Sequence, residues 1–269
     1  MLHVRALASG SSGNAFLVRT ATVTLLLEAG LPITRLRRYL TDEGVVPSDL
    51  TAILVSHEHR DHCLSAGDLA SEGDAPVYAP LEALRASGIA GSTRACLLEP
   101  GQTVRFGDVR VTAFSVPHDA AAPVGFHVRV GDRTFVLATD LGETGGDVGD
   151  AVADADLVIL EANHDTRMLH EGRYPYHLRR RIAGPTGHLS NTQAGALLAG
   201  RLRDDRVDVW LAHLSRNNNT IKAATTTVRT ALRRAGLGEV QVAVAGRDRP
   251  SLTWNGSLRP RQLRLFEDA

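Results

Sequence analysis

Three histidines and an aspartate lie within six positions in the stretch SHEHRDHC, residues 56–63. His57 and His59 are two residues apart, so their side chains point to the same side of an extended chain. Asp61 and His62 follow where the chain must turn, within reach of a second point nearby. Imidazole and carboxylate groups are the usual protein ligands of zinc and similar dications. The stretch therefore predicts a site for two metal ions, with a solvated polar loop as the alternative for any single histidine.

Further candidate ligands follow three other apolar runs. His118 comes after residues 109–117, Asp140 after 134–139 and His213 after 207–212. Functional groups in layered α/β proteins commonly lie just past the end of a strand. We expect His118 to complete the first metal site, His213 to complete the second, and Asp140 to bridge both. The mixed nitrogen and oxygen donors suit Zn²⁺ or Mn²⁺.

Two dications joined by a carboxylate bridge lie about 3.5–4 Å apart and can share one hydroxide. Such a pair lowers the pKa of bound water and stabilises charge on an attacked phosphate. The predicted chemistry is therefore hydrolysis of a phosphodiester. We count Asp61 as a catalytic residue as well as a ligand.

The apolar patterns predict alternating strands and helices around these residues. Strands are expected at 3–8, 15–20, 23–28, 51–56, 76–79, 94–98, 103–106, 109–116, 124–130, 133–139, 156–161, 207–213, 239–245 and 251–255. Helices are expected at 33–43, 64–71, 164–183, 190–202 and 220–235, the fourth beginning at a capping box of Ser190 and Gln193. Two β-rich blocks, each ending in helices, predict a four-layer αββα sandwich that forms one domain over residues 1–269.

The composition is typical of a soluble globular protein. The chain has 269 residues, 43% of them hydrophobic, and a formal net charge of zero, so any attraction to phosphate must be local. No apolar run approaches the roughly 18 residues of a membrane span, and the N-terminus lacks the pattern of a signal peptide. Two cysteines are too few for a disulfide framework. We expect a cytoplasmic protein with no membrane contact.

The ligand set resembles that of the metallo-β-lactamase superfamily over essentially the whole chain. Narrower strings resemble the YycJ/WalJ-type bacterial exonucleases of this fold, namely LASGSSGN (7–14), HDAAAPVGF (118–126), TDLG (139–142), EANHD (161–165), GHLSN (187–191) and HLSRNNN (213–219). The resemblance implies an αββα sandwich without an inserted lid domain and a dinuclear site activated by Mn²⁺. It also implies 5′-to-3′ degradation of single- and double-stranded DNA and a link to mismatch-repair proteins.

Two positions depart from the superfamily pattern. Glu28 stands where the superfamily usually has aspartate, and DHCLSAGD (61–68) lacks the customary DHIxG. Cys63 is interpreted as a small buried hydrophobic residue and not as a ligand.

The resemblance also implies roles outside the ligand set. His188 would be the general acid, oriented by Glu161; the alternative is that His188 only hydrogen-bonds the following turn. Residues of the Gly-rich turn would form a nest for a terminal phosphate, and further polar residues would join that shell. These predicted substrate-binding residues are Ser11, Ser12, Asn14, Asn163, His164, Ser215, Asn218 and Asn219.

A basic segment follows Glu161 and ends at His188, at residues 164–188. It holds five arginines against one aspartate and one glutamate. We interpret it as a surface that follows phosphates, with Arg179, Arg180 and Arg181 at its centre; a solvated helical face is the alternative. Tyr174 and Tyr176 could stack on an unpaired base or pack into the core.

Other functions stay open on the sequence alone. An RNA-processing nuclease would use the same metals. A small-molecule hydrolase of the lactonase or thioesterase type would too, but it needs an enclosed apolar pocket and has little use for nearby arginines. A catalytically inactive binding protein would not need a full ligand set. The aromatic content of 4% favours sequence-independent contacts to the DNA backbone.

Overall fold

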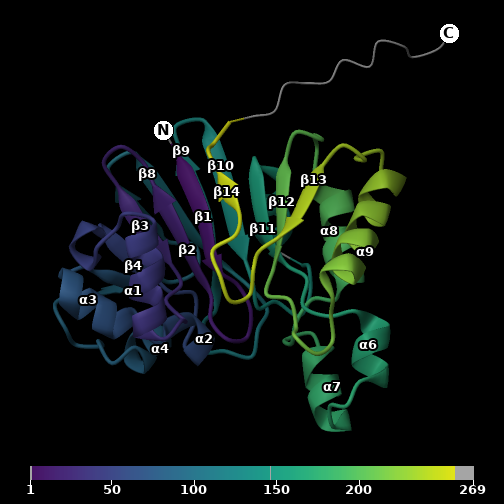
Figure 1. The fold of residues 1–269 in the computed structure, drawn as a ribbon, viewed down its shortest axis with the longest axis horizontal. Helices are drawn as coiled ribbons and strands as arrows, with labels where there is room; N and C mark the ends of the chain where they lie inside the picture. The colour runs from purple at the N-terminus through teal and green to yellow at the C-terminus, as the bar shows by residue number, and fades with distance from the viewer. Residues whose placement is uncertain (1, 146, 258–269) are drawn as a thin grey trace.

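Two seven-stranded sheets pack face to face in the computed structural model, which describes residues 2–145 and 147–257 (Figure 1). The first sheet has the order β14-β1-β2-β3-β4-β5-β6. Its strands are β1 (His3–Ala8), β2 (Ala15–Arg19), β3 (Thr24–Leu27), β4 (Ala52–Leu54), β5 (Val77–Ala79), β6 (Ala95–Leu97) and β14 (Thr253–Trp254). β3 to β6 run parallel, so the segments that follow them emerge at one edge of the sheet.

The second sheet has the order β13-β12-β11-β10-β9-β8-β7. Its strands are β7 (Thr103–Phe106), β8 (Val109–Ser115), β9 (Val124–Val130), β10 (Arg133–Ala138), β11 (Leu157–Glu161), β12 (Asp208–Ala212) and β13 (Gln241–Val244). β10 to β13 are parallel, whereas β7 to β10 form an antiparallel meander.

Helices cover the outer faces of both sheets, which confirms the predicted αββα sandwich (Figure 1). The first sheet is covered by α1 (Ile33–Asp42), α3 (Ala66–Gly73) and α4 (Leu81–Ala86), and the second by α5 (Asp147–Ala153), α8 (Asn191–Arg201) and α9 (Ile221–Arg234). The 3₁₀ helix η1 (Pro47–Asp49) and the short helices α2 (Arg60–Cys63), α6 (Thr166–Glu171) and α7 (Tyr176–Ile182) lie in connections. Within the described ranges, no helix is both long enough and apolar enough to cross a membrane.

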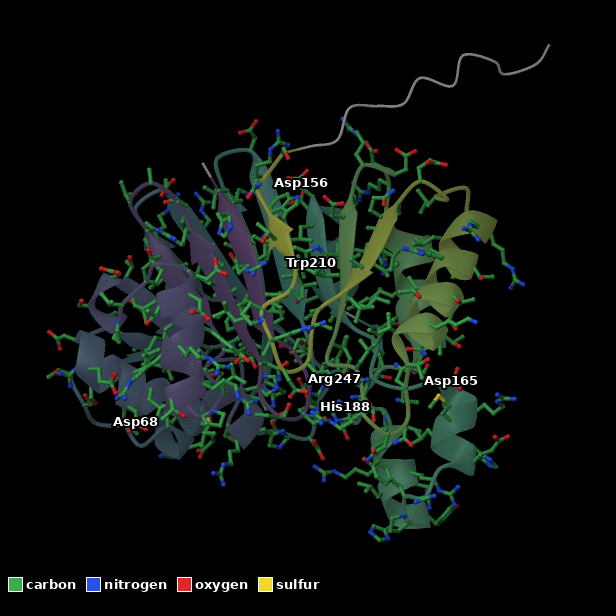
Figure 2. The ribbon with its side chains drawn as sticks, viewed as in Figure 1. Asp68, Asp156, Asp165, His188, Trp210 and Arg247 are labelled. Carbon is green, nitrogen blue, oxygen red and sulfur yellow. The ribbon has the colours of Figure 1, made fainter. Side chains whose placement is uncertain are left out.

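The largest core lies between the sheets, where alternate residues of each strand point inward. Phe16, Phe126 and Phe135 are fully buried there, and Trp210 fills the middle of the sandwich (Figure 2). Burying a side chain of this size contributes about 1.5–3 kcal/mol. The inner faces therefore hold the two sheets, and the strand ends of both, in a fixed relation.

The helical material expected at 164–183 consists of two short helices, α6 and α7. α6 ends at Glu171 and α7 begins at Tyr176. Pro175, which lacks an N–H and precedes the first residue of α7, prevents one continuous helix. Gly172 completes the break, because a Cβ there would lie 2.6 Å from the carbonyl oxygen of Met168. α2, α4 and α5 were not predicted, because each is too short to show a helical period.

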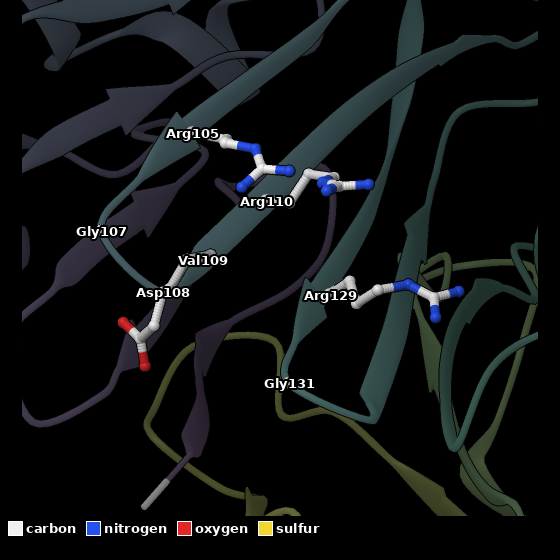
Figure 3. A pocket seen from close by; sticks show the side chains of 7 residues that line it. All are labelled: Arg105, Gly107, Asp108, Val109, Arg110, Arg129 and Gly131. Atoms are coloured by element: carbon white, nitrogen blue, oxygen red, sulfur yellow. The ribbon is translucent and has the colours of Figure 1, made fainter.

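The antiparallel meander carries a row of arginines on its outer face. Arg105 lies opposite Arg110 and Arg110 opposite Arg129 in adjacent strands, around a shallow pocket of about 140 Å³ (Figure 3). Arg129 forms an ion pair with Asp154, whereas Arg105 and Arg110 have no ion-pair partner among the described residues. Arg110 precedes the end of β8 by five residues, about 17 Å of extended strand. This arginine row is thus separated from the strand ends that carry the predicted ligands.

A glycine permits the close packing that positions the first ligand loop. The N–H of Ala29 donates to the carbonyl of His62 at 2.8 Å, and the N–H of Gly30 donates to Asn14 at 3.0 Å. A Cβ on Gly30 would lie only 1.6 Å from the carbonyl oxygen of Asp61. No side chain fits there, so the turn after β3 can support the ligand loop only with glycine at this position.

Candidate dinuclear metal centre

The first candidate ligand group consists of three histidine rings. His57 and His59 come from the loop after β4, and His118 comes from the segment after β8. His57 Nε2 lies 3.0 Å from His59 Nδ1, and His118 Nε2 lies 3.2 Å from that same atom. Three ring nitrogens thus converge on one point. Such a set could hold one dication with further positions open to water or substrate.

The second candidate group lies beside it. Asp61 and His62 belong to α2, and His213 follows β12 directly. Asp61 Oδ2 lies 3.4 Å from His213 Nε2 and 3.8 Å from His62 Nε2. His62 and His213 are buried, whereas a quarter of the Asp61 side chain is exposed. These three groups could hold a second dication close to the first.

Asp140 joins the two groups. Its Oδ2 atom lies 3.0 Å from His62 Nε2, and its Oδ1 atom lies 3.8 Å from His118 Nε2. The contact of Oδ2 with His62 is close, but it lacks hydrogen-bond geometry, and this buried oxygen has no hydrogen-bond partner in the described part of the chain. A buried carboxylate oxygen without a donor is costly unless a cation or an ordered water completes its shell. Asp140 therefore fits a bridging ligand.

Glu161 orients one ligand and one candidate acid. His213 Nδ1 and His188 Nδ1 each donate to Glu161 Oε1 at 2.8 Å, and the N–H groups of Leu141 and Leu189 donate to Oε2 at 3.0 and 3.1 Å. Because Nδ1 of His213 is bound in this way, its Nε2 is left to face Asp61. A carboxylate behind a ligating histidine fixes the tautomer and the ring orientation that metal binding requires.

Hydrogen bonds also orient the histidine rings of the first ligand group. His118 Nδ1 donates to the carbonyl of Gly187 at 3.1 Å, and the Ser56 hydroxyl lies 2.9 Å from His57 Nδ1. Glu28 accepts from the N–H of Ser56 at 3.2 Å, and its carboxylate lies 3.4 Å from Nδ1 of His62. The extra methylene of Glu28 therefore still allows contact with a ligand.

The titration of these groups shows how the buried charges balance without a metal. Burial lowers the pKa of His57 well below its usual value, so that ring is neutral. Burial also opposes the charged form of His213, but Asp140, Asp61 and Glu161 raise the pKa of His213 well above its usual value. Burial would raise the pKa of Glu161, yet His188 and His213 lower it to about 2. The carboxylates thus favour positive charge between them, which a bound cation would also supply.

His188 lies between the two ligand groups. Its ring centroid is 5.2 Å from that of His118 and 5.3 Å from that of His213, and its side chain is 22% exposed. Burial would lower the pKa of His188, but the Glu161 charge and hydrogen bond raise it. Because Nδ1 is held by Glu161, Nε2 is the atom left to meet a substrate. His188 lies at the edge of the sandwich that faces the helices α6 and α7 (Figure 2).

The Gly-rich turn uses several of its polar groups within the fold. The N–H of Gly10 donates to Asn14 Oδ1, that of Gly13 to the carbonyl of Gly10, and that of Asn14 to the carbonyl of Asp61. Asn14 is fully buried, and Ser12 Oγ donates to Asp248, while Ser11 is exposed. The N–H of Asn14 thus holds the ligand loop, and a phosphate nest at Ser11 and Ser12 stays a prediction. Asn14 is thus a positioning residue.

The other predicted polar residues of the substrate shell are also turned inward. Asn163 donates to the carbonyl of His213 at 2.9 Å, and the N–H of Asn218 donates to the Ser215 hydroxyl at 3.1 Å. Asn219 donates to the carbonyls of Ala162 and Asn163, and all of these side chains are buried. They hold the loop that carries His213. His164 lines a pocket that is described below.

The three arginines of α7 differ in their contacts. Arg181 Nε donates to Asp119 Oδ2 at 2.6 Å, the guanidinium of Arg180 lies 5.8 Å from the Tyr176 ring centroid, and Arg179 donates to the carbonyl of His170. Arg180 and Arg181 are exposed and Arg179 is half-buried. The basic segment therefore presents positive charge beside the ligand groups.

Some supporting residues were not predicted from the sequence. Ser56 and Gly187 bind ligand histidines, and Asp119 links the first ligand group to α7. Each is next to a residue already singled out, His57, His188 or His118. That adjacency was the available signal, but the contacts depend on the tertiary fold.

Comparisons with known proteins agree with this geometry. A family model described as a beta-lactamase superfamily domain matches residues 25–207. The exodeoxyribonuclease WalJ of Streptococcus pneumoniae serotype 2 is 37% identical over 238 residues, covering 86% of this chain and 88% of that protein. The exodeoxyribonuclease YycJ of Bacillus anthracis is 35% identical over 241 residues, covering 88% and 91%.

A solved structure shares the fold. The metallo-beta-lactamase fold protein YhfI from Bacillus subtilis superposes with a TM-score of 0.70 over 94% of this chain and 98% of that one. At 18% identity, this similarity concerns the fold alone.

Asp140→Ala should remove bound metal and activity together, because the carboxylate reaches both ligand groups. We expect metal content to fall from two ions per chain to one or none, and DNA cleavage to slow by at least about 100-fold. Metal content by mass spectrometry and the cleavage rate check this. Asp156→Ala, at the opposite edge of the sandwich (Figure 2), is the control and should keep its metal. An Asp140→Ala protein with both ions retained would contradict the bridging role.

Proposed function

This chain belongs to the metallo-β-lactamase superfamily and, within it, to the family of the exodeoxyribonucleases WalJ and YycJ, and from this premise we propose that it is a metal-dependent exonuclease that degrades DNA from the 5′ end. The observation that carries the proposal is the position of His188 between two ligand groups joined by Asp140. Activity on single- and double-stranded DNA, in the cytoplasm and in association with mismatch repair, is part of the same proposal.

Seven side chains would hold two divalent ions: His57, His59, Asp61, His62, His118, Asp140 and His213. When bound, the ions would supply a nucleophile at neutral pH and stabilise charge on the attacked phosphate. We propose Mn²⁺ as the activating ion, with Zn²⁺ as the alternative that the donor set also suits. The donor set supports this proposal because unpartnered Asp140 Oδ2 and three converging ring nitrogens require a cation or protons between them.

The leaving 3′-oxygen of a cleaved phosphodiester needs a proton, and His188 is placed to donate it. Its Nδ1 atom is fixed by Glu161, so Nε2 can hold the proton that is transferred. The side chain is partly exposed, whereas the ligand histidines His62 and His213 are buried. A proton donor in this position typically accelerates cleavage by about 10²–10⁴-fold.

The basic segment supplies the electrostatic attraction for a DNA strand. The last turn of α7 holds Arg179, Arg180 and Arg181. Arg181 donates to Asp119, which follows the candidate ligand His118 in the chain. Guanidinium groups can contact phosphate oxygens in pairs, and such contacts are independent of base sequence. A strand held here would pass directly beside the two ligand groups.

The direct test is a digest of end-labelled DNA and RNA with Mn²⁺ or Zn²⁺. We expect a 5′ label to be released first from single- and double-stranded DNA, and a chelator to stop the reaction, since the ligands alone supply no nucleophile. A substrate with a blocked 5′ end should resist. Equal cleavage of blocked and free 5′ ends would rule out the polarity and leave the metal chemistry intact. Faster cleavage of RNA would favour an RNA-processing nuclease, and no cleavage of either would favour a small-molecule substrate.

His188→Ala should keep its metal and lose rate, because our proposal assigns His188 to proton transfer and to neither ligand group. We expect single-turnover cleavage to slow by about 10²–10⁴-fold with unchanged metal content. His127→Ala, on the outer face of β9, removes an imidazole outside the site and is the control. A His188→Ala enzyme with full rate would show that another group protonates the leaving oxygen.

Changing Arg179, Arg180 and Arg181 together to alanine should weaken DNA binding and flatten its dependence on salt. Each lost phosphate contact reduces the slope of log K against log[salt] by about 0.7–0.9. The matched control is the arginine row, Arg105, Arg110 and Arg129, also changed together to alanine (Figure 3). This control removes the same charge far from the ligand groups and should have the smaller effect. Equal effects of both triple variants would mean that overall charge, and not the α7 surface, attracts DNA.

A further inference from the structure

A pocket of about 280 Å³ lies between α6 and α7. Its apolar wall includes Leu169, Tyr176 and Ala183, and its polar lining includes His164, Arg179 and Arg180. Ligand pockets of roughly 300–1,000 Å³ suit drug-sized molecules, so a pocket just below this range suits one planar heterocycle. None of the metal ligands lines it.

The pocket is joined to the candidate metal centre through both of its walls. His164 follows Glu161 by three residues in the segment after β11. On the other side, the N–H of His188 donates to the carbonyl of Ile182, the last residue of α7, at 2.8 Å. The carbonyl of Gly187 accepts from the ligand His118. The walls of the pocket therefore continue directly into the segments that carry Glu161 and His188.

Two buried polar atoms of the lining have no hydrogen-bond partner in residues 2–145 and 147–257. These are Nδ1 of His164 and Nε of Arg179. His164 is only 2% exposed. Burial lowers the pKa of His164 to about 4, so its ring is neutral and has one donor and one acceptor nitrogen. Arg179 Nε is a donor. Buried polar atoms without partners are rare and call for a ligand or ordered water.

The rim of the pocket carries an exposed aromatic ring. Tyr176 is 67% exposed, and no other Phe, Tyr or Trp side chain in the described ranges is as open to solvent. The Arg180 guanidinium lies 5.8 Å from its ring centroid. An exposed aromatic ring beside a cation is a surface on which a base can stack, and its flanking phosphate can meet the arginines.

We propose that the pocket between α6 and α7 binds the base of a nucleotide next to the phosphodiester that is cut. The base lies against the apolar wall, its polar edge faces the His164 and Arg179 side chains, and its face stacks on Tyr176. This inference rests on the proposed nuclease function and adds a contact to it. A base can enter the pocket only when it is unpaired, so the enzyme favours single strands and frayed ends over closed duplex ends.

A binding experiment tests the pocket without cleavage. A single strand with 2-aminopurine at each of its first three 5′ positions in turn is added to metal-free protein. We expect the fluorescence to be quenched by stacking at one position. Tyr176→Ala should abolish this quenching and weaken binding by about 5- to 100-fold, the range of base–aromatic stacking. Tyr176→Phe keeps the ring and is the control. Because Tyr176 is exposed, neither variant should disturb folding.

A cleavage experiment separates this inference from the proposed function. Strands with an abasic site at each of the same positions are digested with Mn²⁺, and we expect a loss of about 5- to 100-fold in kcat/KM at one position. Abasic ends cut as fast as normal ends at every position, or unchanged quenching with Tyr176→Ala, would overturn the pocket assignment and leave the nuclease intact. If the protein cuts no DNA at all, the nuclease proposal fails. The 2-aminopurine measurement still decides then whether the pocket takes a base.

Discussion

The candidate site depends most on the buried carboxylate of Glu161. It accepts hydrogen bonds from the rings of His188 and His213 and from the backbone of Leu141 and Leu189, so both oxygens are fully used. One group thereby fixes a ligand, a candidate acid and the two chain segments that flank them. A neutral side chain could not accept from four donors at once, because an amide offers only one oxygen. The negative charge and hydrogen bond of Glu161 also raise the pKa of the neighbouring His188.

Strain in the backbone is concentrated around this charge. Four non-glycine residues of the described chain have a left-handed backbone, and three of them, Glu28, Asp140 and His213, belong to the site, with φ of 66°, 58° and 53°. Each lies just past a strand, β3, β10 or β12. Such conformations cost about 1–3 kcal/mol each and persist only where the surrounding structure enforces them. The turns re-aim these side chains from the strand direction toward the two ligand groups, which a relaxed extended chain would not do.

The sequence predicts this site well where the signal is local. The strands and the ligands at their ends follow from apolar runs broken by histidine or aspartate, as at His118 and Asp140. The hydrogen bonds of Ser56 and Gly187 to the candidate ligand histidines could not be predicted. No sequence pattern indicates which residue a hydroxyl or a backbone carbonyl will contact. The hydrogen bond from Asn14 to the ligand loop could not be predicted for a related reason, because it joins segments 47 residues apart.

The division of the ligands between the sheets links the fold to the chemistry. The loop with His57 and Asp61 follows a strand of the first sheet, whereas Asp140 and His213 follow strands of the second. Neither sheet alone carries either of the two ligand groups described above, since His118 of the second sheet joins His57 and His59 in one, and His213 of the second sheet joins Asp61 and His62 in the other. The centre therefore exists only when the core between the sheets has closed, and any cation bound there stabilises that closed state over the unfolded chain. Because the ligand groups form only where the two sheets meet, metal binding is a consequence of folding.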